Sequence, residues 1–251
     1  LNISNIMSAM KKPDYGLDAP GVVRGFLIGG PALLIAGWFL NAWSRPRGIG
    51  PLIGLSSAML GAGIVLFLES FLMMASSYYG KFRARDKLLA GLNLRGDETV
   101  LDVGCGHGLL LIAAAKKLPR GRAIGIDLWS QVDQGNNSRQ ATLENARLEG
   151  VADRVEVRDG DMRKLPFPDA SIDAVIANLA IHNISGREGR RQAVSEIARV
   201  LKPGGQVALM DFKHVGQYVD DLRKSGIADA RPTGFIFWIF PSVRIARGSK
   251  P

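Results

Sequence analysis

The sequence predicts an α/β protein in which a Rossmann-like sheet, with helices on both faces, follows a two-helix transmembrane hairpin. A glycine-rich turn separates a β-branched run from an apolar helical run within residues 99–118. Four more short apolar runs follow, as in a parallel sheet, and two long apolar stretches precede the turn. We expect an N-terminal arm at 1–20, the hairpin at 21–76 and the α/β domain at 77–251.

The composition excludes several classes of protein. The chain has 251 residues and is 47% hydrophobic, which is enough for a large core. Its single cysteine, Cys105, rules out a disulfide framework and a zinc site built from several cysteines. We therefore expect no metal and a reducing, cytoplasmic environment. The net charge of +9 suits nucleic acid, anionic lipid or solubility alone, so the placement of the charges has to decide.

The two long apolar stretches have the length of membrane spans. Phe26–Trp43 is apolar apart from Asn41, and Pro51–Ala75 contains one carboxylate, Glu69. The linker 44–50 holds arginine, proline and glycine, which continue neither helix. A cleaved signal peptide is a weaker reading of the first stretch, because no short charged region and cleavage site accompany it. Helix pairing between copies of the hairpin also offers a route to oligomers.

Basic residues flank the hairpin asymmetrically. By the positive-inside rule, the larger number outside the turn predicts that both termini and the α/β domain are cytoplasmic. These cations also form a collar toward anionic headgroups, so the bilayer is an expected partner and nucleic acid is not. The flanking residues are Lys11, Lys12, Arg24, Lys81, Arg83, Arg85 and Lys87, against Arg45 and Arg47 in the turn.

Three features near the membrane allow further hypotheses. Ile3, Ile6, Met7 and Met10 have the spacing of a short interfacial helix. Arg24 and Glu69 lie at similar depths of an antiparallel hairpin, so we expect an ion pair, the alternative being that Glu69 lines a substrate cavity. Phe235–Pro241 is read as a buried strand or, if exposed, as an aromatic segment that dips into the membrane interface.

The glycine turn indicates a nucleoside site. Gly104 and Gly106 let the backbone pass close beneath a ligand. The spacing Gly-x-Gly-x-Gly differs from the dinucleotide pattern, which would place glycine at Leu109. Asp102, on the preceding strand, suits a ligand with a cationic amino-acid tail, and Cys105 lies within the turn.

The second strand, Ala123–Ile126, leads to Asp127, about 25 residues after the first carboxylate, where an acidic residue accepts hydrogen bonds from ribose hydroxyls. Leu128 and Trp129 then offer apolar surface for an adenine face.

The third and fourth strands add residues at the same edge of the sheet. After Arg154–Val157, Asp161 is suited to accept from the adenine amino group and Met162 to meet the ring edge. After Ile172–Ile176, Asn178 and Leu179 are expected beside the reacting centre. The segment 201–205 closes a helix and turns into a fifth strand, residues 206–210.

The ordered set VLDVGCGHG, IGID, GDM, IANLAIHN and LKPGG resembles the class I S-adenosylmethionine-dependent methyltransferases, particularly their small-molecule and quinone- or lipid-modifying branch. The resemblance covers about residues 81–250. It implies a seven-stranded sheet with the last strand antiparallel, S-adenosylmethionine as cofactor and S-adenosylhomocysteine as product. The implied cofactor-binding residues are Asp102, Gly104, Cys105, Gly106, Asp127, Leu128, Trp129, Asp161, Met162, Asn178 and Leu179.

The expected chemistry needs few protein groups, because a sulfonium is already an activated methyl donor. His182 is the candidate base, and Asn178 and Asn183 are candidates for orienting the substrate. His214 and Tyr218 are second candidates. Asn178 is not followed by the Pro-Pro-aromatic motif of enzymes that methylate nucleic-acid amino groups, which disfavours that class.

These observations favour an integral-membrane methyltransferase whose acceptor is a small lipophilic molecule of the quinone, sterol, polyprenyl or phospholipid type. One alternative is a membrane-anchored regulator or scaffold that binds the cofactor without turnover. A nicotinamide-dependent reductase is disfavoured by the glycine spacing and by the lack of a Tyr-x-x-x-Lys pair.

Overall fold

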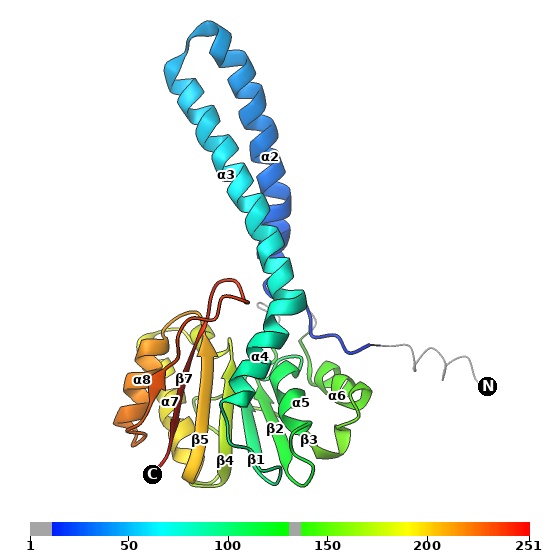
Figure 1. Cartoon of the computed structure of the whole chain (residues 1–251), viewed down its shortest axis with the longest axis vertical. Coiled ribbons are helices and arrows are strands. Elements are labelled where there is room, and N and C mark those ends of the chain that lie inside the picture. Colours follow the sequence, from blue (N-terminus) through cyan, green and yellow to red (C-terminus); the bar gives the residue numbers. More distant parts are fainter. Residues whose placement is uncertain (1–11, 131–136) are drawn as a thin grey trace, which may run out of the picture.

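The computed structural model describes residues 12–130 and 137–251. An α/β domain carries a long helical hairpin that projects away from it (Figure 1). The hairpin consists of α2 (Pro20–Ser44) and α3 (Gly50–Ala75), joined by the short helix η1 (Arg45–Arg47). The interfacial helix expected from Ile3 to Met10 lies outside the described residues.

Seven strands form one sheet in the order β3-β2-β1-β4-β5-β7-β6, and β7 runs antiparallel to β5, as expected. The central strands are buried apolar runs, which is the pattern of a parallel sheet covered on both faces. The strands are β1 (Thr99–Val103), β2 (Arg122–Asp127), β3 (Val155–Asp159), β4 (Ile172–Asn178), β5 (Leu201–Asp211), β6 (Arg231–Pro232) and β7 (Arg244–Ser249).

The expectation that residues 201–205 turn into the fifth strand is wrong. They do not form a turn before the strand, because β5 already begins at Leu201, directly after its helix. Leu201 pairs with Ile172 and Gln206 pairs with Ala174, so the intervening residues form an irregularity in the ladder with β4. The Pro-Gly-Gly sequence therefore lies within β5, where it forms a bulge, and not before the strand.

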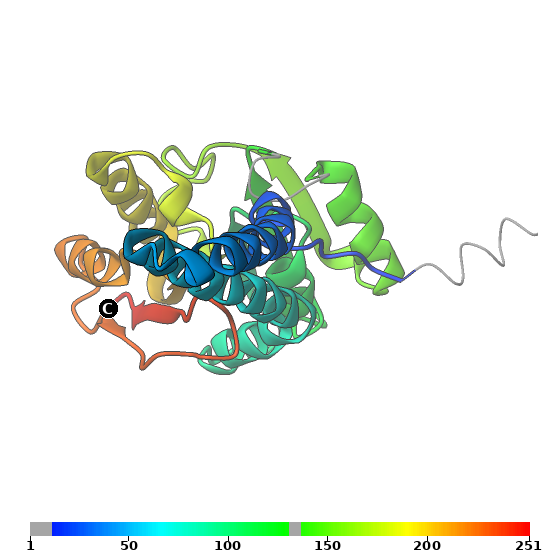
Figure 2. The same ribbon diagram turned by 90° about the horizontal axis from the view of Figure 1, so that it is seen from above.

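Helices cover both faces of the sheet (Figure 2). Buried side chains of α4 (Lys81–Ala90), α5 (Leu109–Ala115) and α6 (Arg139–Leu148) contribute to one hydrophobic core. Those of α7 (Arg187–Val200) and α8 (Val215–Lys224) contribute to the core on the opposite face. Short helices η3 (Ala152–Arg154) and η4 (Ile181–Asn183) complete the connections.

The strand order reverses between β1 and β4, which are neighbours although β2 and β3 separate them in the chain. Such a switch point opens a crevice at the carboxyl ends of the strands, where ligands bind in open α/β sheets. That edge of the sheet faces the base of the hairpin (Figure 1).

Small residues hold the two long helices together. The buried positions recur every seven residues, which is the period of left-handed helix packing. A Cβ added to Gly63 would lie 2.8 Å from the Gly30 carbonyl oxygen, so the two backbones are in contact there. Close approach of this kind is characteristic of helix pairs in membranes. The buried positions are Val23, Gly30, Gly37 and Ser44 in α2 and Ser56, Gly63 and Ser70 in α3.

The second long helix enters the α/β domain without a flexible linker. One wide helical turn, η2 (Ser76–Gly80), joins α3 directly to α4. A Cβ on Gly80 would lie 1.7 Å from the Trp238 carbonyl oxygen, and the Phe240 amide donates to Ser76 Oγ at 2.9 Å. The chain between β6 and β7 therefore packs against the base of the hairpin.

Three expectations about the hairpin and the residues near its base are wrong. No ion pair joins Arg24 and Glu69, although both lie within the described chain. Lys81 is only 4% exposed and so does not belong to a collar of headgroup-facing cations. Phe235–Pro241 is not a buried strand: Ile236 and Ile239 point inward, whereas Phe235, Phe237 and Trp238 are exposed.

Two helical stretches, Pro20–Arg47 and Gly50–Ala90, are long and apolar enough to cross a membrane. In the most apolar 18-residue part of each stretch, only 17% and 11%, respectively, is buried. Large apolar side chains of α2 and α3 point outward instead, among them Ile28, Ile35, Trp38, Phe39, Ile64, Val65, Leu68 and Phe71.

We predict that Gly63→Val separates the two long helices. The added side chain would collide with the Gly30 carbonyl and with Leu34, so the expected loss is about 1–3 kcal/mol of stability. Gly61→Val is the matched control, because a Cβ at Gly61 meets nothing within 4 Å. Thermal unfolding of the purified protein in detergent measures the difference. Equal unfolding temperatures for the two variants would contradict the backbone contact.

Candidate functional site

The glycine turn after β1 adopts the backbone conformation expected for a ligand loop. Gly104, Gly106 and Gly108 have φ values of +74°, +51° and +84°, which favour glycine over residues with a Cβ. The amides of Gly104 and Cys105 donate to the Ile126 carbonyl at 2.8 and 3.2 Å. A Cβ on Gly104 would also lie 2.3 Å from that of Ala180. The turn is thus held between β2 and the loop after β4.

Asp127 links the glycine turn to the loop that follows β2. One of its carboxylate oxygens accepts from the Gly106 amide at 2.8 Å, and the other accepts from the Trp129 amide at 2.6 Å. A carboxylate has about four acceptor positions, so it keeps capacity for a ligand hydroxyl. Residues 131–136 lie outside the described chain.

Of the residues expected to contact an adenine, some are exposed and others already contact neighbouring residues. Leu128 is exposed, whereas the Trp129 indole N–H donates to Asp159 at 2.7 Å. The Met162 methyl group lies 3.3 Å from where a Gly104 Cβ would stand, which places this side chain beside the turn.

Asp161 is engaged with a neighbour that the sequence analysis did not consider. The Arg163 guanidinium binds its carboxylate, with Nε 2.8 Å from one oxygen, and hydrogen bonding to Arg163 lowers the pKa of Asp161. Its expected contact with an adenine amino group therefore stays a prediction, and it requires a carboxylate shared with Arg163. The sequence does contain a signal for this ion pair, because Arg163 lies only two residues after Asp161.

Asp102 is the most unusual group at the switch point. Its side chain is 1% exposed, and within the described chain neither carboxylate oxygen accepts a well-aligned hydrogen bond. Burial, reinforced by the charge of Asp127 and opposed by hydrogen bonding from the Leu111 backbone, raises the pKa of Asp102 to about 8. A buried carboxylate with so little hydrogen bonding is costly to ionise, so this position is suited to a cationic ligand group.

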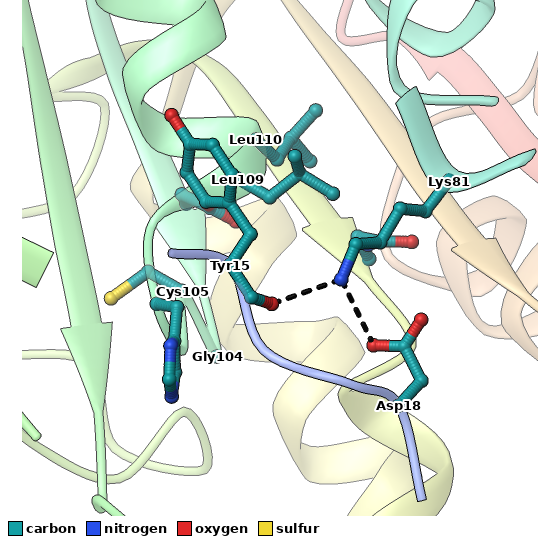
Figure 3. A pocket seen from close by; sticks show the side chains of 10 residues that line it. Tyr15, Asp18, Lys81, Gly104, Cys105, Leu109 and Leu110 are labelled. Atoms are coloured by element: carbon teal, nitrogen blue, oxygen red, sulfur yellow. Dashed lines mark hydrogen bonds and ion pairs between the residues drawn. The ribbon is translucent and has the colours of Figure 1, made fainter. Parts of the chain in front are cut away.

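Asp102 is one of the residues that line a pocket at the glycine turn. Figure 3 shows this pocket, with Gly104 and Cys105 of the turn labelled. Gly104 and Cys105 line it from the turn, as expected. Asn178 lines it from the end of β4, and within the described residues its side-chain oxygen is buried without a partner. Leu179 follows with φ +52°, and its amide donates to the Met210 carbonyl at 2.9 Å. Burial raises the pKa of the Cys105 thiol, so this cysteine is poorly reactive.

His182 lies beyond β4, against a buried carboxylate from β5. Its Nδ1 is 2.9 Å from Asp211 Oδ1, although the ring N–H is not aligned for a hydrogen bond. The His182 amide donates to the other Asp211 oxygen at 3.2 Å, and the Tyr218 hydroxyl donates to that same oxygen at 3.0 Å. The Phe212 ring packs edge-on against the imidazole, with ring centres 4.6 Å apart.

The sequence analysis missed Asp211, although its position at the end of a predicted strand was a signal. Asp211 is 1% exposed, and burial together with this carboxylate raises the pKa of Tyr218. Asn183 is exposed, and His214 is the residue before α8, with φ +60°. Of the second candidates, Tyr218 is hydrogen-bonded to Asp211, whereas His214 is close enough for the charge of Asp211 to act on it.

Residues on both sides of the hairpin also reach the pocket, which the sequence analysis did not anticipate. Tyr15, Asp18 and Lys81 line it together with Asp102. Within the described residues, no group of three or more His, Cys, Asp or Glu side chains is arranged to hold a metal ion.

The part of the chain around this pocket is similar to known proteins. Residues 101–209 match a family model described as a methyltransferase domain. The 27-O-demethylrifamycin SV methyltransferase of Amycolatopsis mediterranei is 35% identical over 52% of this chain and 44% of that protein. The demethylmenaquinone methyltransferase of Lactobacillus johnsonii is 31% identical over 51% of this chain and 49% of that protein. The chain thus spans about half the length of these relatives or less.

Solved structures share the fold. A SAM-dependent methyltransferase from Aquifex aeolicus superposes with a TM-score of 0.55 at 20% identity, over 72% of this chain and 98% of that one.

We predict that Asp102 makes the stability of the ligand-free protein depend on pH. Because its pKa rises from about 3.9 in the unfolded chain to about 8 in the folded protein, folding is favoured by the neutral acid. That contribution is complete below pH 4 and is lost as pH rises toward 8, by about 1.4 kcal/mol per unit at most. Asp102→Asn removes the titration.

The measurement is the unfolding midpoint of wild type and Asp102→Asn between pH 5 and pH 8.5. The variant should gain stability relative to wild type as pH rises. Asp97→Asn, at an exposed carboxylate, is the control and should show a constant difference. A constant difference for Asp102→Asn as well would mean that this carboxyl is already ionised at pH 5.

Proposed function

We propose that this chain, whose residues 101–209 form an S-adenosylmethionine-dependent methyltransferase domain, methylates a small lipophilic acceptor at the cytoplasmic surface of a membrane. The observation that carries the proposal is the buried, unpartnered carboxylate of Asp102 beside the glycine turn. A dinucleotide diphosphate would meet repulsion there, whereas the ammonium of a methionyl group would be neutralised.

The residues at the switch point fit S-adenosylmethionine. Asp102 would bind the methionyl ammonium, and Asp127 has acceptor capacity left for the ribose hydroxyls. Leu128 and Met162 offer apolar surface for adenine. When bound, the cofactor supplies a methyl group that is already activated by its sulfonium.

His182 is the proposed general base. Asp211, close to Nδ1, favours the tautomer with the proton on that nitrogen, which leaves the lone pair on Nε2. Nε2 would take the proton from an acceptor hydroxyl or acidic carbon as that atom bonds to the methyl carbon and the sulfur–carbon bond breaks. Tyr218 and the His182 amide hold the Asp211 carboxylate in place.

The exposed apolar surface of the hairpin supports a membrane location. A core helix of a soluble protein is mostly buried, whereas both long helices here expose most of their apolar side chains. Helices of 25 and 26 residues also exceed the roughly 20 residues that a bilayer core requires. Basic residues outside the η1 turn favour a cytoplasmic α/β domain.

An aromatic surface surrounds the base of the hairpin. Tyr78 and Tyr79 on η2 are exposed, as are Phe235, Phe237 and Trp238 on the segment that packs against Gly80. Aromatic side chains of this kind favour the headgroup level of a bilayer. The carboxyl ends of the parallel strands face the same way (Figure 1), so an acceptor dissolved in the bilayer would have a short path to the site.

The acceptor class follows from this location. A lipophilic ring compound with an ionisable hydroxyl or carbon would partition into the interface and present its reacting atom to His182. One relative is named for demethylmenaquinone, a lipid-soluble quinone precursor. We propose a quinone-type acceptor for this chain, with other membrane lipids as the alternatives.

The product assay tests the reaction itself. Full-length protein in detergent is incubated with methyl-labelled S-adenosylmethionine and a total membrane lipid extract, and labelled lipids are identified by mass spectrometry. A labelled quinone-type species supports the proposal, and a labelled phospholipid would replace the acceptor class. Tight cofactor binding without any labelled product would favour a non-catalytic regulator.

We predict that His182→Ala lowers methyl transfer to that lipid extract by about 10²- to 10⁴-fold, because a positioned general base contributes about that factor. Asp211→Asn should also lower the rate, since the amide no longer favours the Nδ1 tautomer. Cofactor affinity, measured by calorimetry, should stay within a few-fold. His214→Asn is the control, because asparagine tolerates the φ of +60° at that position. Equal losses in His182→Ala and His214→Asn would argue against His182 as the base.

We also predict the topology of the hairpin. Pro46→Cys, in the η1 turn, should react with a membrane-impermeant maleimide in intact cells, whereas Asp86→Cys on α4 should react only after lysis. The native Cys105 is buried, so it should not react with the maleimide. Labelling of Asp86→Cys in intact cells would invert the topology, and labelling of neither site until lysis would argue against a span.

A further inference from the structure

The segment before the hairpin lies directly over the glycine turn. We call residues 14–18 the strap. The Asp14 carbonyl accepts from the Asn145 side chain at 2.7 Å and lies 3.1 Å from His107 Nδ1. The Asp14 amide donates back to Asn145 at 2.9 Å, and the Tyr15 hydroxyl donates to Glu149 at 2.9 Å. The strap is therefore fixed to the turn and to α6 by specific hydrogen bonds.

Lys81 joins the strap to the other end of the hairpin. It is the first residue of α4, directly after the wide turn that follows α3. Its ammonium donates to the Tyr15 carbonyl at 2.9 Å and to the Gly16 carbonyl at 2.5 Å, and it lies 3.8 Å from Asp18 (Figure 3). Burial lowers the pKa of Lys81, and the nearby carboxylates of Asp18 and Asp14 oppose that shift.

One pocket thus contains the ammonium of Lys81 and the carboxyl of Asp102, whose raised pKa favours its neutral form until a cationic ligand binds. Lys81 is 4% exposed and Asp102 is 1% exposed, and both line the pocket. Within the described residues, the only ion pair of Lys81 is the long one with Asp18. Its two short hydrogen bonds go to main-chain carbonyls, and a ligand carboxylate would compete with the longer contact to Asp18. A zwitterion would suit the two groups, because its ammonium would favour the ionised form of Asp102 and its carboxylate would accept from Lys81.

We propose that Lys81 binds the carboxylate of the methionyl group while Asp102 binds its ammonium, so that the strap and the end of the hairpin complete the cofactor site. This inference rests on the proposed function and adds to it. The hairpin is then part of the binding site for the soluble cofactor, in addition to anchoring the domain. The alternative is a structural lysine that holds the strap in place and never contacts the ligand.

The test compares two ligands that differ only in the carboxylate. S-adenosylmethionine and decarboxylated S-adenosylmethionine are titrated into full-length protein in detergent, without an acceptor, and binding is measured by calorimetry. Wild type should bind the decarboxylated ligand about 10- to 100-fold more weakly, as expected for the loss of one charge-assisted hydrogen bond. Equal affinities in wild type would overturn the proposal without any variant.

Lys81→Met should lower the affinity for S-adenosylmethionine by a similar factor, while the affinity for the decarboxylated ligand changes by no more than about threefold. Equal losses for both ligands would assign Lys81 the structural role, and no loss for either would remove it from the site. Lys87→Met, an exposed lysine on the same helix, is the matched control and should bind both ligands like wild type.

The failure of this inference is distinct from failure of the proposed function. Wild type that binds neither ligand, nor S-adenosylhomocysteine, would refute the cofactor assignment itself. Binding of 5′-methylthioadenosine, which lacks the whole amino-acid group, reports whether the adenosine half of the site is intact. Lys81→Met should keep that affinity, and its loss would show that the substitution had damaged the fold around the turn.

Discussion

The ammonium group of Lys81 donates to two carbonyls of the chain that precedes the hairpin, and it does so from the helix that follows the hairpin. This buried contact ties the start of α2 and the end of α3 to each other beside the glycine turn. It holds residues 14–18 over the turn, where Tyr15 and Asp18 line the pocket together with Asp102. A lysine is expensive to bury, and the two carbonyls and Asp18 offset that cost.

A second consequence concerns charge at the switch point. The pocket has the carboxyl of Asp102 on its β1 side and the ammonium of Lys81 on its hairpin side, and the amide of Asn178 also lines it. Burial disfavours the charged form of both groups, so keeping them there costs stability. Local instability of this kind is expected where a site is organised for a ligand before the ligand arrives.

The sequence predicted the parts of the molecule that local patterns determine. Alternation of apolar runs and turns located β1 to β5, and the Gly-x-Gly-x-Gly turn located the switch point. Contacts between distant segments could not be read in this way. Lys81 resembled a surface cation because its partners are main-chain carbonyls, which leave no pattern in side-chain sequence. Asp211 was overlooked because its partner, His182, belongs to a different strand–loop unit.

The failed expectations have similar physical causes. Arg24 and Glu69 occupy comparable depths, but the helices meet through their small residues, and equal depth does not place two side chains on the facing surfaces. Phe235–Pro241 has the composition of a strand, yet Gly80 admits the segment's backbone against the helix and turns its aromatic rings outward. Composition alone does not distinguish these outcomes.

The seven-residue repeat of the hairpin relates the length of its helices to the position of Lys81 at the pocket. The repeat in α3 continues from Ser70 to Ser77, which hydrogen-bonds Asp18, and Lys81 follows about one helical turn later. Each residue advances a helix by about 100°. Adding or removing a single residue within α3 would turn the lysine away from the strap, whereas a change of seven residues would nearly restore its phase. The length of α3 is therefore constrained by the contacts of Lys81 at the pocket, because it fixes the direction in which that side chain points.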